Sequence, residues 1–395
     1  MRFYSILEVL VSKSNPLRSV RQAKPISGLV ATACACLGLL FSASALQAEE
    51  ESWFRKNFVD PEDNNLDASE WLSKGGFLPL PLAITEPAID NGLGIALGFI
   101  GPTDPDNDIP PDFTGAAALF TGNGSEVYAA FHEGTYANGK LKLSGFAALT
   151  DINLDFYLGS STGLRYNING GMASATATYQ LGSSNWYAGG TWRYTDADVR
   201  FKGLSGSASL PLALNATLSG VGLVLDYYSL DNTFTPTSGT SARLGVIRFD
   251  DAVGSDFDYT KSIASVFTYS SPTDRLTLGG KFVAEAVNGN APFFVLPAIN
   301  LRGIPAIRYQ GDAAYSAEFE ATYRIADRWR VVGFTGIGWA DDQTAGADRK
   351  IKATYGTGVR YRIARRLGID LGLDIARGPE ETVFYFQFGR AWRRF

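Results

Sequence analysis

The sequence has very few of the residues that thiol, redox or metal chemistry requires. It holds two cysteines, one histidine and two methionines. Cys34 and Cys36 both lie in residues 1–48, which we interpret as a removable signal. The mature chain would then contain no cysteine, which excludes disulfides, thiolate metal sites and catalytic thiols. Because His132 is the only histidine, metal sites built from several histidines are excluded as well. We therefore expect no cofactor and no metal.

The sequence after residue 48 also lacks the roughly 20 consecutive apolar residues of a membrane-spanning helix. Residues 1–48 contain a basic stretch followed by the apolar run "GLVATACACLGLLFSASALQA", which is rich in small residues near its end. This order is typical of a secretory signal peptide cleaved after Ala48 or Ala45. A retained transmembrane helix is the alternative, but the run is short for a span.

The mature chain has a shortage of positive charge. Removing the signal's five basic residues and one acid from 35 Lys/Arg and 40 Asp/Glu leaves a net charge of −9, with histidine neutral. This acidity argues against a nucleic-acid partner.

Residues 49–77 are polar and lack the alternation of a strand. We expect a periplasmic lead-in, or a segment tucked into a lumen, with a short helix beginning near Asp67 or Ser69. The acidic cluster could bind calcium, but it lacks the ligand spacing of a calcium loop, so a solvated loop is predicted. This cluster consists of Asp60, Glu62, Asp63 and Asp67.

From Leu78 onward, apolar residues recur with a period of two. In "LGIDLGLDIAR" the leucines and isoleucines fall on one face, and Gly, Asp and Ala fall on the other. In "YSAEFEATYRI" the same pattern turns Glu318 and Glu320 away from the aromatic face. Aromatic residues at strand ends favour a lipid-facing barrel over a soluble sandwich, because a membrane barrel carries aromatic girdles.

The pattern predicts an all-β fold, a transmembrane antiparallel β-barrel over residues 78–395 in the outer membrane. We count about 16 strands, an even number that suits a bacterial barrel. Their expected centres lie near residues 82, 97, 117, 130, 150, 172, 193, 224, 245, 264, 281, 320, 334, 357, 371 and 387. The segment from Asn288 to Asp312 is then the sixth external connection.

The chain ends in "FYFQFGRAWRRF", an aromatic closing strand. Alternation places Phe384, Phe386, Phe388 and Trp392 on one face, which we expect to meet lipid. Together with Phe395 these residues form the kind of C-terminal signal that barrel assembly machinery recognises. Outer-membrane lipid and that machinery are therefore the expected partners.

Several segments resemble the BamA/TamA outer-membrane assembly superfamily, also called the bacterial surface antigen family. They are "FLPLPLAITEPAIDNGLGIALGF", "LDNTFTPTSGTSARLGV", "LRGIPAIRYQGDAAYSAEFEATYRI", "VVGFTGIGWA" and "FQFGRAW", and they span the barrel in order. The resemblance implies that Arg302 and Gly303 lie at the tip of the sixth external loop, which folds back into the lumen. It also implies that Arg302 meets an inward acid, Glu320, on the following strand, and Glu318 is the neighbouring candidate. Two positions depart from the family: Gly336 replaces an aspartate and Ile304 replaces an aromatic residue.

The resemblance further implies a role in protein or lipid insertion or translocation at the outer membrane. The best-known members carry periplasmic docking repeats, whereas about thirty residues precede the first expected strand here, too few for such a domain. This leaves a docking step to a separate periplasmic protein. A passive porin-like channel, or a structural barrel without assembly activity, is the alternative.

Enzyme activity is not expected. One Gly-x-Ser-x-Gly match, residues 159–163, is followed by "LRYNINGG", which predicts a strand where a nucleophile elbow needs a helix. We interpret this match as an external turn between the fifth and sixth strands. His132 lies in a predicted strand beside Glu133, where a girdle or lumen histidine is expected rather than a general base.

Overall fold

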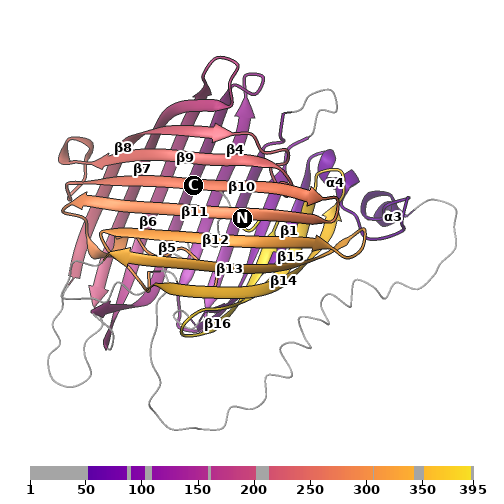
Figure 1. Ribbon diagram of the computed structural model, residues 1–395. Coiled ribbons are helices and arrows are strands. Elements are labelled where there is room, and N and C mark those ends of the chain that lie inside the picture. Colours follow the sequence, from indigo (N-terminus) through magenta and orange to yellow (C-terminus); the bar gives the residue numbers. More distant parts are fainter. Residues whose placement is uncertain are drawn as a thin grey trace, which may run out of the picture.

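The chain forms one antiparallel sheet of 16 strands, paired in sequence order from the first to the last and curled into a barrel (Figure 1). The computed structural model describes residues 52–86, 90–102, 109–158, 162–201, 213–305, 307–341 and 351–392. The predicted signal peptide, residues 1–48, lies outside the described residues. Among the residues that are described, no helix has the length and apolar character to cross a membrane.

Each strand contains one predicted centre, so the predicted barrel and its strand count are confirmed. The strands are β1 Gly76–Glu86, β2 Asp90–Ile100, β3 Phe113–Thr121, β4 Glu126–Tyr136, β5 Leu141–Leu158, β6 Thr162–Gln180, β7 Trp186–Phe201, β8 Ala213–Tyr228, β9 Gly239–Phe249, β10 Tyr259–Thr273, β11 Leu276–Gly289, β12 Ala313–Arg324, β13 Trp329–Asp341, β14 Lys352–Ala364, β15 Ile369–Arg377 and β16 Thr382–Phe388.

The short helices are separate from the strands of the wall. They are α3 Trp53–Phe58, α4 Ser69–Ser73, and the 3-10 turns η1 Asp251–Val253 and η2 Phe293–Val295. With an even number of antiparallel strands, the start of β1 and the end of β16 lie at the same end of the barrel. We call this end the terminal mouth and the opposite end the loop mouth. Figure 1 shows α3 and α4 gathered at the terminal mouth.

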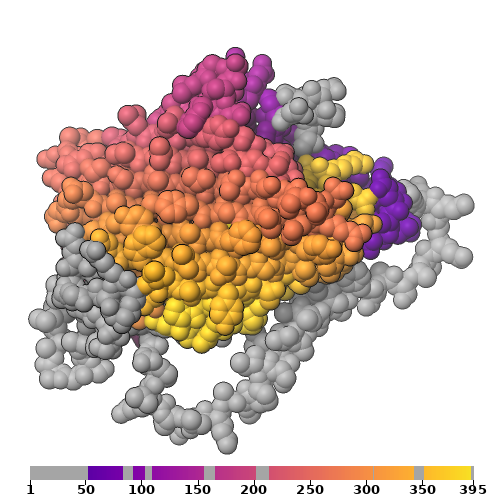
Figure 2. Space-filling model, in the orientation of Figure 1, coloured from indigo at the N-terminus to yellow at the C-terminus, as the bar shows by residue number. Residues whose placement is uncertain are grey.

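Side chains alternate between the outside and the lumen, as the period of two predicts. On β13 the side chains of Val331 and Ile337 are exposed on the outer face, while Val332 and Phe334 are buried in the lumen. Figure 2 shows the outer wall over β10–β14 as a continuous surface of side chains. Exposed Leu, Val and aromatic residues on such a surface suit contact with hydrocarbon.

The lumen is filled near both mouths. Toward the loop mouth, Phe294 and Ile307 of the β11–β12 connection pack with buried residues of strands β3–β11. Toward the terminal mouth, Leu72 of α4 packs with Leu78, Ile100 and other buried residues of the wall. Charged side chains lie between these two apolar clusters, including the ion pair of Arg243 with Asp226, whose Nε–Oδ1 distance is 2.8 Å.

The lead-in is ordered on the barrel, which corrects the predicted solvated loop. Three members of its acidic cluster, Asp60, Asp63 and Asp67, bind the guanidinium of Arg328, whereas Glu62 stays exposed beside Arg365. Sequence patterns cannot show this contact, since Arg328 lies in the turn between β12 and β13. The predicted helix exists as α4, and the side chain of Asp67 accepts the backbone N–H of Ser69 at its start.

Candidate functional site

The β11–β12 connection enters the lumen rather than standing in solvent. A bridge between Ala298 and Gln310 closes its base into a hairpin. At the tip, Leu301, Arg302 and Ile304 are all buried. Gly303 adopts φ 90°, a left-handed conformation that glycine reaches without steric cost. The tip of this connection therefore lies buried in the lumen.

Glycines in the wall make room for the loop. A Cβ built on Gly336 would lie 2.8 Å from Cδ2 of Leu301, and a Cβ on Gly338 would lie 2.6 Å from Cγ2 of Ile299. At the tip, a Cβ on Gly378 would lie 1.8 Å from the carbonyl oxygen of Gly303. Gly336, noted above as a departure from the family, therefore has a local reason here, because the loop occupies the space beside it.

Arg302 binds both glutamates of β12 that the sequence turned inward. Its Nε donates to Oε1 of Glu318 at 2.9 Å, and its backbone N–H donates to Oε2 at 3.2 Å. A terminal nitrogen lies 2.7 Å from Oε2 of Glu320, within ion-pair distance but without hydrogen-bond geometry. The structure therefore brings Arg302, Glu318 and Glu320 together, with Glu318 making the closer set of bonds.

A third acid comes from a strand farther along the wall. Asp374 of β15 accepts a hydrogen bond from the other terminal nitrogen of Arg302 at 2.8 Å. Arg360 of β14 donates to the same carboxylate at 2.5 and 3.0 Å, and Gln387 of β16 donates at 3.0 Å. Arg302 thereby ties the loop to β12 on one side and to the last three strands on the other.

Aromatic rings enclose the guanidinium. Its central carbon lies 3.5 Å from the centroid of the Phe334 ring, a stacking that suits the planar arginine group. The indole N–H of Trp392 donates to Oε1 of Glu318 at 2.5 Å. Gly303 contributes its backbone N–H to the hydroxyl of Tyr385 at 2.8 Å. The site is thus a buried anchor that holds the loop tip by ion pairs, hydrogen bonds and ring contacts.

Two charged members of this site, Asp374 and Arg360, were missed by sequence reasoning, as were the neighbouring Phe334, Tyr385 and Gln387. Asp374 already fell on the inward face of "LGIDLGLDIAR", and Arg360 on the inward face of "GTGVRYR", so alternation carried the signal for their direction. Alternation along a strand does not predict which inward residues meet across the lumen. That pairing depends on barrel curvature and on the depth to which the loop inserts.

The prediction for the closing strand is wrong in part. Phe384 is 53% exposed on the outer face as expected, but Phe388 is 3% exposed and stacks on Phe113 at 5.6 Å. Trp392 is 4% exposed and lies in the lumen rather than on the lipid face. Gly389, with a φ of 68°, follows the last residue of β16, so the period of two no longer applies at Trp392. Phe388 is buried because it packs with Phe113 in the terminal-mouth cluster.

Phe386 is half-buried beside the terminal-mouth cluster. Phe395 lies outside the described residues, so its predicted part in the C-terminal signal stays a prediction.

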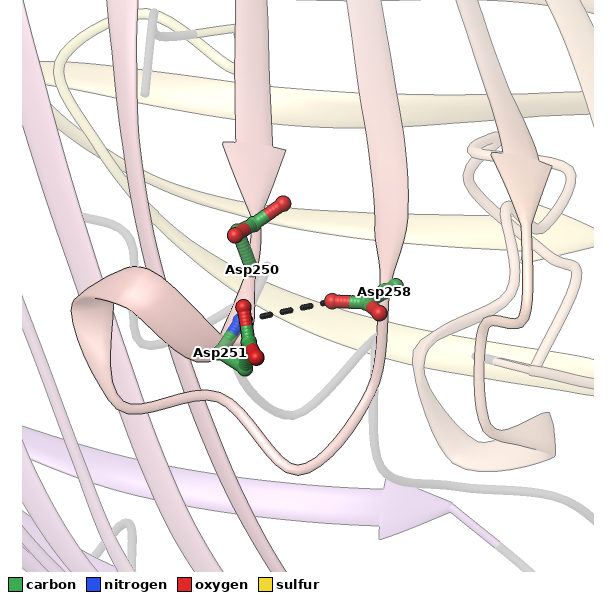
Figure 3. Close-up of side chains that lie close together, drawn as sticks. All are labelled: Asp250, Asp251 and Asp258. Atoms are coloured by element: carbon green, nitrogen blue, oxygen red, sulfur yellow. Dashed lines mark hydrogen bonds between the residues drawn. The ribbon is translucent and has the colours of Figure 1, made fainter.

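Three acids gather at the loop mouth, where the side chains of Asp250, Asp251 and Asp258 converge around the η1 turn (Figure 3). Each position has a structural explanation. Asp250 pairs with Arg248 at 2.8 Å and caps η1 at the N–H of Ala252. Asp258 accepts the backbone N–H of Asp251 at 3.3 Å. These contacts account for the cluster as a loop-folding feature.

The other residues considered for catalysis lie apart from the Arg302 site. His132 is on β4, where its ring contacts the hydroxyls of Thr114 and Tyr136 at 2.8 and 2.6 Å. The Gly-x-Ser-x-Gly match falls at the β5–β6 connection, whose residues 159–161 lie outside the described residues.

Comparison with known proteins gives similar solved structures but no similar sequences. No protein-family model and no curated protein matches the chain. The chain is similar to BamA from Haemophilus ducreyi lacking POTRA domains 1–3, at 13% identity and a TM-score of 0.53, covering 98% of this chain and 81% of that one. It is also similar to CdiB from Acinetobacter baumannii, at 10% identity and a TM-score of 0.54, covering 79% of this chain and 59% of that one.

CdiB from Escherichia coli gives a third match, at 12% identity and a TM-score of 0.52, covering 78% of this chain and 61% of that one. The chain therefore spans about three fifths of the length of either CdiB. At such low identity the likeness establishes the fold: this chain has a 16-stranded barrel of the BamA and CdiB type.

Proposed function

We propose that this chain is an integral outer-membrane protein that takes part in inserting or translocating protein or lipid at that membrane. The observation that carries the proposal is the Arg302 anchor. It fixes the longest described connection inside the lumen of a barrel that has the BamA and CdiB fold. The proposal gives this anchor a positioning role and assigns no catalysed reaction to the chain.

The filled lumen favours this role over a passive porin-like channel. An open channel needs a wide, polar path from one mouth to the other. In the described part of the barrel, the loop around Arg302 crosses the lumen, and apolar clusters occupy it near each mouth. A barrel closed in this way suits a protein that works through rearrangement of its wall or loop.

The proposed partners follow from the same features. The exposed apolar wall is expected to contact outer-membrane lipid. Barrel assembly machinery is expected to insert the chain itself, and a separate periplasmic protein is proposed to deliver substrates.

A reconstituted insertion assay tests the proposal. Purified protein is placed in liposomes, a urea-denatured small outer-membrane barrel is added as the probe, and its folded, heat-modifiable band is followed over time. We expect faster folding of the probe than in empty liposomes, and a loss of that gain with Arg302→Ala. Arg248→Gln, which removes an exposed ion pair at the loop mouth, is the matched control. Equal rates with wild-type protein and empty liposomes would overturn the proposal.

A further inference from the structure

We propose that the lead-in is a clasp that ties the two ends of the barrel wall together at the terminal mouth. The clasp consists of residues 59–73 of the lead-in together with Arg328 and Arg365, which lie in the turns after β12 and β14. This inference concerns how the wall is held closed. It stands independently of what the protein inserts or translocates.

The clasp is held on one side by a buried arginine. Arg328 is 3% exposed at its side chain, and its guanidinium contacts three carboxylates of the lead-in. Nε lies 2.7 Å from Asp63, one terminal nitrogen lies 2.5 Å from Asp67, and the other contacts Asp60. An arginine with this many partners is costly to release, because separation leaves several buried charges without a counterion.

Backbone contacts fasten the lead-in to the turn after β14. The N–H of Ala68 donates to the carbonyl of Ile363 at 2.6 Å. The hydroxyl of Tyr361 donates to the carbonyl of Leu66 at 2.8 Å. The backbone N–H of Arg365 donates to Asp67 at 3.1 Å, and its guanidinium contacts Asp63 at 2.7 Å. The lead-in is therefore bound to β14 and to the β12–β13 and β14–β15 turns through side chains and backbone alike.

The other side of the clasp is β1 itself. Two residues, Lys74 and Gly75, separate α4 from the first strand. The indole of Trp71 donates to the carbonyl of Phe77 at 2.9 Å, and Leu72 is fully buried in the terminal-mouth cluster. Any movement of β1 away from the last strands must therefore pull on α4 and on the arginine contacts behind it.

The clasp lies at the terminal mouth, the end of the barrel at which β16 ends. β1 and β16 lie beside each other and bring the ends of the sheet together. β16 covers Thr382–Phe388, and Gly389 then turns the tail into the lumen, where Trp392 binds Glu318. At the terminal mouth the lead-in therefore links β1 to β14 and to the turns that hold Arg328 and Arg365.

Distance measurements between spin labels test the clasp. One label pair, Phe77→Cys with Leu373→Cys, uses lipid-facing positions on β1 and β15, on the two sides of the junction. A second pair, Leu149→Cys with Leu244→Cys, reports on the opposite wall. With native clasp residues, both pairs should give a single narrow distance distribution.

Arg328→Gln should add a longer-distance population to the Phe77–Leu373 pair and leave the Leu149–Leu244 pair unchanged. Arg248→Gln, which removes an ion pair at the loop mouth, should change neither. If Arg328→Gln does not fold, Asp63→Asn gives a milder break of the same contact. The double exchange Arg328→Asp with Asp67→Arg should shorten the added distance again. A folded Arg328→Gln protein with an unchanged Phe77–Leu373 distribution would overturn the clasp.

Discussion

Arg302 joins parts of the barrel that are distant in sequence. It binds Glu318 and Glu320 of β12 and Asp374 of β15, and Arg360 shares the last of these carboxylates. Its fork can serve several carboxylates at once, which a lysine ammonium cannot do with the same geometry. The side chain therefore acts as a positioning group that fixes where the loop tip sits between two regions of the wall.

Arg302→Ala should lower the stability of the folded barrel by about 3–5 kcal/mol, because it removes the buried counterion of Glu318 and leaves Asp374 with Arg360 alone. Arg302→Lys should recover part of this loss, since it keeps the charge but not the fork. Urea unfolding of protein folded in lipid vesicles measures both variants. Arg248→Ala, at an exposed ion pair, should change stability by about 0–1 kcal/mol. An Arg302→Ala loss no larger than that of Arg248→Ala would contradict the anchor.

At the scale of elements, the strands were the most predictable part. Each strand turns alternate side chains toward the lumen, so its own sequence predicts which residues face inward and roughly where the strand ends. Glu318 and Glu320 could be turned inward on that basis, and the resemblance supplied Arg302 as their partner. Contacts between segments that are distant in the sequence cannot be predicted from this alternation. The docking of the acidic lead-in on Arg328 joins segments separated by more than half of the chain.

The closing strand shows where alternation stops being a guide. Extending the period of two through Gly389 placed Trp392 on the lipid face, but β16 ends at Phe388 and Gly389 is left-handed, so the alternation does not continue to Trp392. Glycine at this position was visible in the sequence, and a bend was a possible consequence. The direction of the bend depends on what the tail meets, which here is the Glu318 carboxylate.

The clasp should weaken in acid. Hydrogen bonds from Arg328 lower the pKa of Asp63 below its ordinary value of 3.8, although burial opposes the shift. A carboxylate with a lowered pKa in the folded protein stabilises it fully above the ordinary value, and this contribution is lost as the pH falls below it. The difference in thermal stability between wild-type protein and Asp63→Asn should be constant between about pH 7 and about pH 5, and should shrink below about pH 4. A difference that grows on acidification would contradict this assignment.

At the scale of the whole molecule, the described part of the barrel has ion pairs and apolar clusters inside and exposed apolar side chains outside. Loop, lead-in and C-terminal tail all turn into or across the lumen and bind there to charged or apolar residues of the wall. The fold thus combines a 16-stranded wall with three inward segments. Under the proposed function, these segments keep the lumen closed.

Single-channel recording tests the central claim, that the loop anchored by Arg302 closes the lumen. Purified wild-type protein in a planar lipid bilayer should show a closed baseline with at most brief openings. Arg302→Ala should open more often and for longer, because the loop loses its contacts with Glu318 and Asp374. A large, steady conductance of the wild-type protein, unchanged by Arg302→Ala, would contradict the account.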